Sequence, residues 1–546
     1  MEKRKSLPDA GLRSLDHYQQ KLPPWRYSLR KSFLPLVRWE TPYLAWLQET
    51  VRTPSLDSWF AITANLGTHT FYMVMLPMLF WCGYTDIGRG MVHLLAAGVF
   101  FSGVIKDLLC LPRPLSPPLQ RITMSGSAAL EYGFPSTHST NAISVVYYAI
   151  HLLNSPDTDI SPLKKIIFQT LLYLYGTSIV FGRLYCGMHG FLDVIVGSTL
   201  GAVLAFIQCS YGSIFDDFLF SSTIQGVIVV ALVILTLVRI HPEPADSCPC
   251  FDDSVAFAGV LIGHEFGNWH YAQTRFSVSE PIPGTVPFSL ERIGWFKSIL
   301  RILLGVVIIV VWREVMKPSL LRFLPPVFRV IERLGLSLPR RFFTKASEYK
   351  RIPDHLKDDD VIPNVSEIPS MLTSIRHPRR RAISIGPQSE ADAYETLAYR
   401  QKRRRESMSP EYQPTPNGVP SSPLRERPLN SRQLSEADIS KLADKAAAKT
   451  PARSPRKLDE YENMMGMGSP AAVSNIVRNS VEGADNVAVS DAQLDEQEEK
   501  EMFSRIKPPR VRYDVEVVTK LIVYSGIGWL AVEMNPILFY LLGLGS

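Results

Sequence analysis

The chain has 546 residues and a net charge of +6, from 58 Lys and Arg against 52 Asp and Glu. Because no basic face interleaved with aromatic residues accompanies this small excess, nucleic acid is a poor candidate partner. The mean hydropathy near zero averages two unlike parts. Apolar runs dominate up to about Trp312, and residues 350–510 are almost entirely polar.

The first residues are basic and polar, and no apolar core follows them. We therefore expect no cleavable signal peptide, and membrane insertion through internal spans. Residues 35–46 carry Trp39, Tyr43 and Trp46 among charged residues, a pattern typical of a helix in the membrane interface.

Apolar runs long enough to cross a membrane follow. They predict spans at 59–82, 91–105 with its flanks, 140–153, 166–181, 191–209 and 224–240, then at 299–311 and from 521 to the end, the last broken at Asn535-Pro536. Residues 255–262 are too short to assign. In lipid every backbone polar group must bond internally, and the pattern lacks the alternation of a barrel. The predicted fold is all-α, a polytopic transmembrane helical bundle.

Residues 350–510 are rich in Ser, Pro, Arg, Glu and Gln, so they cannot bury enough apolar surface to fold alone. We expect a long disordered polar insert. Ser384 and Ser407 follow arginine triplets and Ser454 precedes a proline, contexts that suit protein kinases but also arise by chance in such linkers. The predicted regions are an N-terminal arm with an interfacial helix (1–56), a transmembrane core (57–240), additional membrane segments (241–340), the polar insert (341–512) and a C-terminal span (513–546).

The cysteines lie mostly within or beside apolar spans. Cys248-Pro-Cys250 has no second cysteine pair at ligand spacing, so no zinc module is expected, and the redox state of this pair stays open. Other ligand-type residues nearby lack a His-Glu-x-x-His spacing. They are Asp252, Asp253, His264, Glu265 and His270. The sequence therefore predicts no metal site.

Lys106 ends the second predicted span, and Arg113 follows in a loop held by Pro112 and Pro114. A guanidinium fork can take two phosphate oxygens and an ammonium is a compact point charge, so the pair fits a phosphate. Basic side chains at the end of a span also snorkel toward water without binding anything. Taken alone, the pair favours that simpler explanation.

Gly133-Phe-Pro-Ser-Thr-His-Ser139 directly precedes the third span. Backbone N–H groups and the Ser136 hydroxyl would then lie at a helix N-terminus, where an anion is favoured. His138 could there protonate a leaving oxygen. A histidine at a helix start is more often a capping or surface residue.

Arg183 ends the fourth span, and His189 and Asp193 stand four residues apart at the start of the fifth, on one helical face. A carboxylate bonded to Nδ1 would leave the Nε2 lone pair free, as a histidine nucleophile or base requires. Such pairs are also common in ordinary helices.

The three groups together have a chance expectation on the order of one in ten thousand from average composition. By parity, the ends of the second and fourth spans and the starts of the third and fifth face one side of the membrane. Cations and histidines at a membrane edge are costly to keep unless they are used. We therefore predict one composite anion-binding site.

This constellation resembles the type 2 phosphatidic acid phosphatase superfamily. Its signature of Lys-x6-Arg-Pro, Pro-Ser-x-His and Arg-x5-His-x3-Asp is matched at 106–114, 135–138 and 183–193. Thr137 and Gly182 stand where that superfamily often has Gly and Ser. Together with Trp39-Glu-Thr-Pro-Tyr43, Gly67-Thr-His-Thr70 and Arg512-Tyr-Asp-Val-Glu516, they look like the sphingosine 1-phosphate phosphatases, specifically the fungal long-chain base phosphate phosphatases of the endoplasmic reticulum.

The resemblance implies a metal-independent lipid phosphate phosphatase without a cofactor. His189, oriented by Asp193, would attack phosphorus, and His138 would protonate the leaving alkoxide before water resolves the phosphohistidine. The phosphate oxygens would be held by Lys106, Arg113, Ser136, Thr137 and Arg183. The expected partners are the bilayer, the phosphate of sphingosine, dihydrosphingosine or phytosphingosine, and protein kinases acting on the insert.

Phosphatidate or a polyprenyl pyrophosphate is an alternative substrate, and a non-enzymatic lipid-binding or transport bundle is an alternative function. The resemblance implies an endoplasmic reticulum membrane protein with a lumenal active site. Two spans before the first motif place the N-terminal arm on that same side, although its Lys and Arg residues argue for the cytosol.

Overall fold

The computed structural model describes residues 11, 15–67, 69–116, 119, 121–122, 131–156, 160–336, 340–352 and 511–545. All of them belong to one compact unit, formed by Met1–Ala393 with Lys500–Ser546. Most of the predicted polar insert, with Ser384, Ser407 and Ser454, lies outside the described residues.

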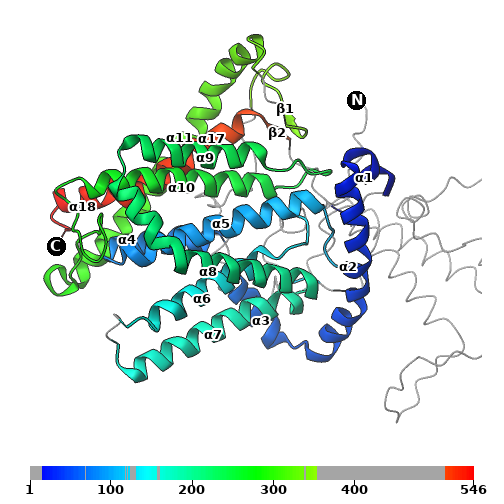
Figure 1. The fold of residues 1–546 in the computed structure, drawn as a ribbon, viewed down its shortest axis with the longest axis horizontal. Helices are drawn as coiled ribbons and strands as arrows, with labels where there is room; N and C mark the ends of the chain where they lie inside the picture. Colours follow the sequence, from blue (N-terminus) through cyan, green and yellow to red (C-terminus); the bar gives the residue numbers. More distant parts are fainter. Residues whose placement is uncertain are drawn as a thin grey trace, which may run out of the picture. The chain divides into compact units, whose positions relative to one another are not determined.

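Long apolar helices form the body of the described structure (Figure 1). They include α5 (Thr85–Leu109), α6 (Thr137–Leu153), α7 (Pro162–Tyr185), α8 (Phe191–Ser221) and α9 (Ile224–Ile240). Among the described residues, four helical stretches are long and apolar enough to cross a membrane: α5, α7, α8 and Val515–Leu541. The predicted all-α, multi-pass membrane fold is therefore confirmed.

One end of this bundle collects the sequence motifs, as parity predicted. Lys106 lies in the last turn of α5 and Arg183 in the last turn of α7, whereas Ser136 caps the start of α6. The Ser136 N–H donates to the Asp193 carbonyl at 3.0 Å, which joins the start of α6 to the start of α8. We call this end of the bundle the motif end.

The first predicted span is wrong as a single helix. Residues 59–82 are divided between α3 (Pro54–Asn65) and α4 (His69–Trp81), with Gly67 at the break. A Cβ atom on Gly67 would lie 3.2 Å from the ring of His138, so the chain passes directly beside that histidine. α3 is tied to α7 by the Trp59 Nε1–H, which donates to Ser178 Oγ at 2.9 Å.

A helix that the sequence left unassigned lies in the middle of the bundle. α10 (Cys250–Ala272) includes residues 255–262 and packs closely on α17 (Val515–Trp529). A Cβ atom on Gly263 would come within 1.8 Å of the Ser525 carbonyl oxygen, so only glycine permits this contact. Hydropathy misses this helix because it counts Asp252, in the first turn, as unfavourable in a membrane. In the folded chain the Asp252 carboxylate is paired with Arg512, at 3.4 Å.

The later membrane segments also differ from prediction. α11 (Leu290–Arg333) is much longer than 299–311 and is kinked at Gly294, whose φ is 75°. After α17 the chain continues through a π-helical turn, η5 (Leu530–Met534), into α18 (Asn535–Leu541). The break expected at Asn535-Pro536 is absent because Pro536 lies at the start of α18, where its missing N–H is tolerated.

Two short parallel strands flank the insert. β1 (Phe343–Thr344) pairs with β2 (Arg512–Tyr513). Arg340 donates to the His241 carbonyl at 3.1 Å, and Arg512 donates to the Cys248 carbonyl at 2.7 Å. Because α9 ends and α10 begins at the motif end, both described ends of the insert lie there.

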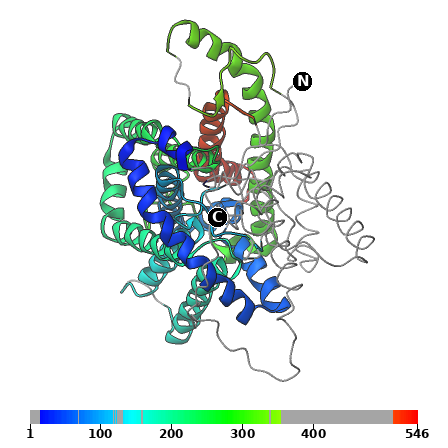
Figure 2. The same cartoon turned by 90° about the vertical axis from the view of Figure 1, so that its right-hand side faces the viewer.

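α1 (Leu15–Lys21) and α2 (Pro24–Val51) also lie at the motif end, where α2 crosses the bundle (Figure 2). Arg26 donates to the Leu108 carbonyl and Gln48 to the Tyr185 carbonyl, each at 2.8 Å. The expected interfacial helix at 35–46 is thus part of a longer helix. Its aromatic residues Trp39, Tyr43 and Trp46 are all more than half exposed.

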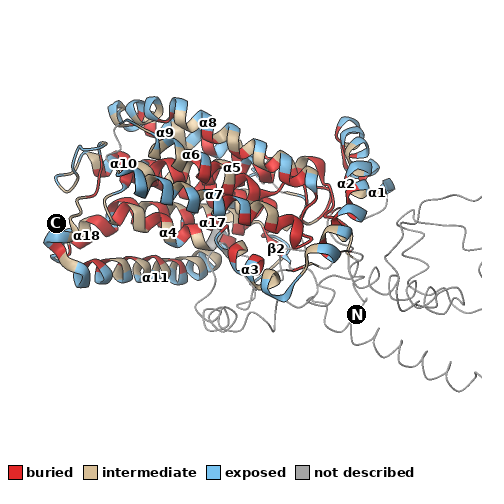
Figure 3. Cartoon of the chain, turned by 90° about the horizontal axis from the view of Figure 1, so that it is seen from below, coloured by how far each residue is buried: buried red, intermediate tan, exposed pale blue. Residues whose placement is uncertain are grey.

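Burial separates the inner and outer faces of the bundle (Figure 3). α8 presents Ile195, Phe206 and Ile214 outward, each more than half exposed. Its inner face is lined by glycines: a Cβ atom on Gly197 would lie 2.5 Å from the Ser136 carbonyl oxygen. The small residue lets α8 approach the start of α6, as in close membrane-helix packing.

Candidate active site

His189 lies in the connection between α7 and α8. Its Nδ1 is 2.9 Å from the Gly133 carbonyl oxygen, and its Nε2 is 3.1 Å from Arg113 Nη1. A carbonyl can only accept and a guanidinium can only donate, so these partners assign the proton to Nδ1 and the lone pair to Nε2. This is the tautomer that a histidine nucleophile needs.

Asp193 is in the first turn of α8, but His189 precedes the helix, so the two do not share a helical face as predicted. Asp193 Oδ2 accepts from the Gly190 N–H at 2.9 Å and lies 3.5 Å from His189 Nδ1. The nearer partner of the imidazole is therefore Gly133, which sequence reasoning placed at the site without this role. Asp193 adds a negative charge beside it.

Lys106 and Arg113 converge on Glu131. The Lys106 Nζ is 2.9 Å and the Arg113 Nη2 is 3.5 Å from the same oxygen, Oε2. Arg113 also donates to the Met188 carbonyl at 2.9 Å, next to His189. Burial lowers the pKa of Arg113 to about 10, so it remains charged at neutral pH.

Arg183 is buried, with 6% of its surface exposed. Its Nε atom has no hydrogen-bond partner among the described residues. A buried guanidinium atom without an acceptor is unfavourable, and such a group indicates a place for an anion.

The charges around His189 link the predicted residues into one group. Burial lowers the pKa of His189 well below its usual value, and the positive charges of Arg113, Lys106, Arg183 and His138 lower it further. The imidazole is therefore neutral at neutral pH and lies in a strongly positive field.

The start of α6 supplies hydroxyl and N–H groups. Ser136 Oγ accepts from the Ser139 N–H at 3.3 Å, as a helix cap. The Thr137 hydroxyl lies 2.9 Å from Ser102 Oγ on α5 and ties the start of α6 to α5. This contact accounts for threonine where the resemblance has glycine.

The glycine at 182 has a packing reason. A Cβ atom there would lie 3.0 Å from the ring of Phe60, so its absence lets α3 pack against α7. The hydroxyl that a serine would add is therefore replaced by a closer helix contact.

Glu40 of α2 is a residue of this region that sequence reasoning missed. Its Oε1 accepts from the Leu192 N–H at 2.9 Å, and burial raises its pKa. A Cβ atom at Gly190 would lie 2.0 Å from Glu40 Oε2, so any side chain there would displace the Glu40 carboxylate. The segment Trp39-Glu-Thr-Pro-Tyr43, which contains this glutamate, contributed to the family resemblance, but the sequence analysis assigned Glu40 no role at the site.

Comparison with known proteins agrees with this geometry. The sequence profile of the PAP2 superfamily matches residues 89–213, which contain every predicted site residue. A dihydrosphingosine 1-phosphate phosphatase of Schizosaccharomyces pombe is 41% identical over 315 residues, covering 58% of this chain and 75% of the relative. The chain belongs to the PAP2 superfamily. It is therefore a phosphatase.

Other relatives of this PAP2 protein carry related names. A dihydrosphingosine 1-phosphate phosphatase of Saccharomyces cerevisiae is 34% identical, covering 57% of this chain and 75% of the relative. A human sphingosine-1-phosphate phosphatase is 27% identical, covering 53% and 73%. No solved structure is significantly similar to the chain.

The described residues contain two clusters of ligand-type side chains, and Asp107 of the second one directly follows Lys106. His93, His264 and Glu265 have ligand atoms within 4.8 Å of one another, as do Asp107, Cys248 and Cys250. Sequence spacing could not reveal the first cluster because His93 comes from α5. Cys248 and Cys250 form a disulfide. Neither cluster contains a predicted site residue, and the absence of a metal from the reaction stays a prediction.

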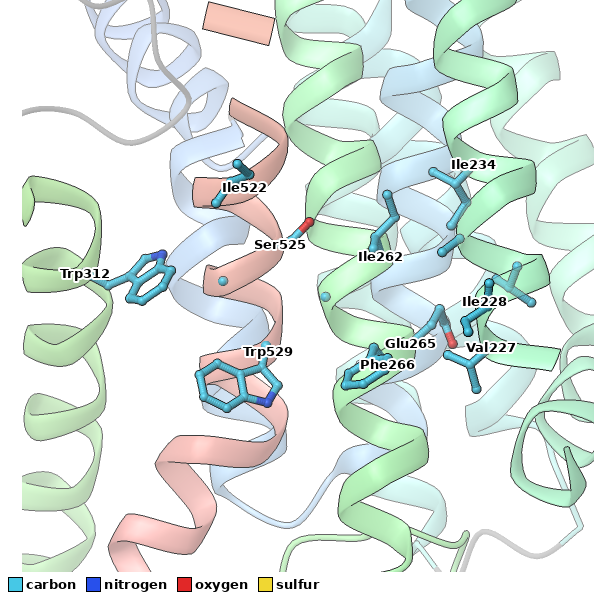
Figure 4. A pocket seen from close by; sticks show the side chains of 14 residues that line it. Val227, Ile228, Ile234, Ile262, Glu265, Phe266, Trp312, Ile522, Ser525 and Trp529 are labelled. Carbon is cyan, nitrogen blue, oxygen red and sulfur yellow. The ribbon is translucent and has the colours of Figure 1, made fainter. Parts of the chain in front are cut away.

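An apolar pocket of about 360 Å³ lies between α9, α10 and α17 (Figure 4). Val227, Ile262 and Trp529 are among its lining residues, and Glu265 is the one ionisable side chain in that lining. Its lining therefore offers no cation for a phosphate, in contrast to the motif end.

Proposed function

We propose that this protein hydrolyses the phosphate monoester of sphingoid long-chain base 1-phosphates through a phosphohistidine intermediate. The observation that carries the proposal is the neutral His189, whose Nε2 lone pair lies among Lys106, Arg113 and Arg183. The names of the relatives support a sphingosine, dihydrosphingosine or phytosphingosine head group.

In the first step, the His189 Nε2 lone pair forms a bond to phosphorus and the bond to the lipid oxygen breaks. The imidazole becomes positive, and its Nδ1–H is held by the Gly133 carbonyl and the nearby Asp193 charge. His138 gives its proton to the departing alkoxide. Lys106, Arg113, Arg183 and the N–H groups at the start of α6 stabilise the phosphate oxygens.

In the second step, water attacks the phosphohistidine. His138, now neutral, accepts the proton of that water as the bond between phosphorus and Nε2 breaks. Inorganic phosphate leaves and His189 regains its neutral tautomer. Three positive side chains neutralise the phosphate charge, so we propose that neither a metal nor another cofactor is needed.

We expect the purified full chain to release phosphate from dihydrosphingosine 1-phosphate at an undiminished rate in EDTA. Phosphatidate and a polyprenyl pyrophosphate serve as comparison substrates, and preferred hydrolysis of either would replace the sphingoid assignment. If the chelator stops the reaction and Mg²⁺ or Zn²⁺ restores it, the cation cradle is the wrong account. Failure to release phosphate from all three lipids would favour a lipid-binding or transport bundle.

We further propose that the protein lies in the endoplasmic reticulum membrane with the motif end in the lumen. The described ends of the insert and α2 lie at that same end, and the sequence of the insert contains no apolar span. A lumenal site therefore also places Ser384, Ser407 and Ser454 in the lumen, out of reach of cytosolic kinases. The lumenal site and phosphorylation by cytosolic kinases exclude each other.

Glycosylation mapping distinguishes these two expectations. We expect an acceptor sequence introduced at Ser116, and another placed beside Ser407, both to be glycosylated in microsomes. An acceptor in the short loop after α4, near Tyr84 at the opposite end, serves as the matched control and should stay unmodified. Modification of the control alone would place the motif end in the cytosol.

A further inference from the structure

A carboxylate occupies the place between the two cations of the first motif. The Glu131 Oε2 atom is shared by Lys106 and Arg113, at 2.9 Å and 3.5 Å. The Arg113 Nε–H also donates to the Glu131 carbonyl oxygen at 3.2 Å, which fixes the backbone at this point. The proposed reaction gives this carboxylate no task, because phosphate oxygens take over both cations.

Burial separates a basic floor from an acidic rim. The side chains of Lys106 and Arg113 are 5% exposed, whereas that of Glu131 is 25% exposed. Glu131 therefore lies on the outer side of the cations, where the rest of the head group lies once the phosphate is bound.

Phosphate binding changes the surroundings of Glu131. The carboxylate loses Lys106 and Arg113 and is left beside a phosphate dianion, and a partly buried carboxylate that loses its cations is strongly disfavoured. A lipid phosphate without a positive charge meets this repulsion in full. A substrate that brings its own cation next to the phosphate removes it, so the same carboxylate favours one substrate and opposes another.

Sphingoid base phosphates carry such a cation. Their ammonium group is on the carbon next to the one that bears the phosphate ester. A phosphate held by the cations of the floor therefore brings the ammonium close to Glu131 on the rim. We infer that Glu131 forms an ammonium subsite that selects lipid phosphates with a free amine beside the phosphate. The inference rests on the proposed phosphatase function and names the residue that sets its head-group choice.

The test compares two lipids on the purified full chain in detergent micelles. One is dihydrosphingosine 1-phosphate, and the other is the same lipid with hydrogen in place of the amine. We expect wild-type kcat/KM to favour the amine by on the order of tenfold, as for a partly exposed ion pair. Glu131→Gln, which keeps the shape of the side chain but not its charge, should lose that preference, chiefly through a rise in kcat/KM for the lipid that lacks the amine. Glu131→Asp should retain part of it.

Glu291→Gln is the matched control. This glutamate is exposed in the first turn of α11. Shortly before α11, the Val286 N–H donates to Thr85 Oγ1 at the start of α5. Glu291 therefore lies near the end of α5 that is opposite Lys106. The control should leave both rates unchanged. If Glu131→Gln slows both lipids by the same factor, or alters neither, Glu131 merely holds the two cations and the ammonium subsite is refuted. Loss of phosphate release from both lipids by the wild-type chain would instead count against the phosphatase function itself.

Discussion

His189→Ala is expected to lower phosphate release from the lipid by at least about 10⁴-fold, because it removes the atom that bonds to phosphorus. Asp193→Asn should leave measurable turnover. The Nδ1–H of His189 is held at 2.9 Å by the Gly133 carbonyl, and Asp193 lies farther away, at 3.5 Å. Loss of the Asp193 charge should therefore lower the turnover rate by less than the roughly 10⁴-fold seen when the carboxylate of a hydrolase triad is removed.

Rapid quenching with substrate labelled in its phosphate measures the intermediate directly. Wild-type protein and Asp193→Asn should both yield an acid-labile phosphoprotein, and His189→Ala should yield none. His151→Ala provides the control, since this histidine is exposed in the last turn of α6. Near-normal phosphate release by His189→Ala would remove His189 from the nucleophile role.

The motif end could be predicted from the sequence because it depends on local rules. Lys106 and Arg183 end apolar runs and Ser136 begins one, so counting spans was enough to bring them to one side of the membrane. The count placed the motifs at one common end even though its first span is two helices, since α3 and α4 together still carry the chain from the motif end to the start of α5.

The immediate partners of His189 could not be predicted in this way. Gly133 and Arg113 reach the imidazole through the packing of two connections, and no periodic pattern records such contacts. Glu131 escaped notice for the same reason, although it lies two residues before Gly133. Its proximity to Lys106 depends on how the chain returns from α5 to α6.

Long-range charge pairing explains the missed helix. The first turn of α10 contains Asp252, whose partners Arg512 and Lys520 come from the other side of the polar insert. Hydropathy counts each of these residues as unfavourable in a membrane protein, whereas the folded chain neutralises them together. A span that carries ionisable residues is therefore found only when its partners are known.

His138→Ala is expected to slow the lipid phosphate by about 10³-fold, and to leave the first turnover of an aryl phosphate within about tenfold of wild type. A sphingoid alkoxide needs a proton as its bond to phosphorus breaks, whereas nitrophenolate leaves without one. His138 lies in the first turn of α6, close enough to His189 to interact with it electrostatically, as the proposed proton donor must.

The first turnover is the informative quantity because His138 is also proposed to activate water in the second step. For nitrophenyl phosphate, His138→Ala should give a burst of nitrophenolate followed by slow steady-state release, and His151→Ala should behave as wild type. Equal slowing of the first turnover for both substrates would mean that His138 binds phosphate rather than donating a proton. The general acid would then have to be another group near the start of α6, where Ser139 and Thr137 have hydroxyls already bonded to Ser136 and Ser102.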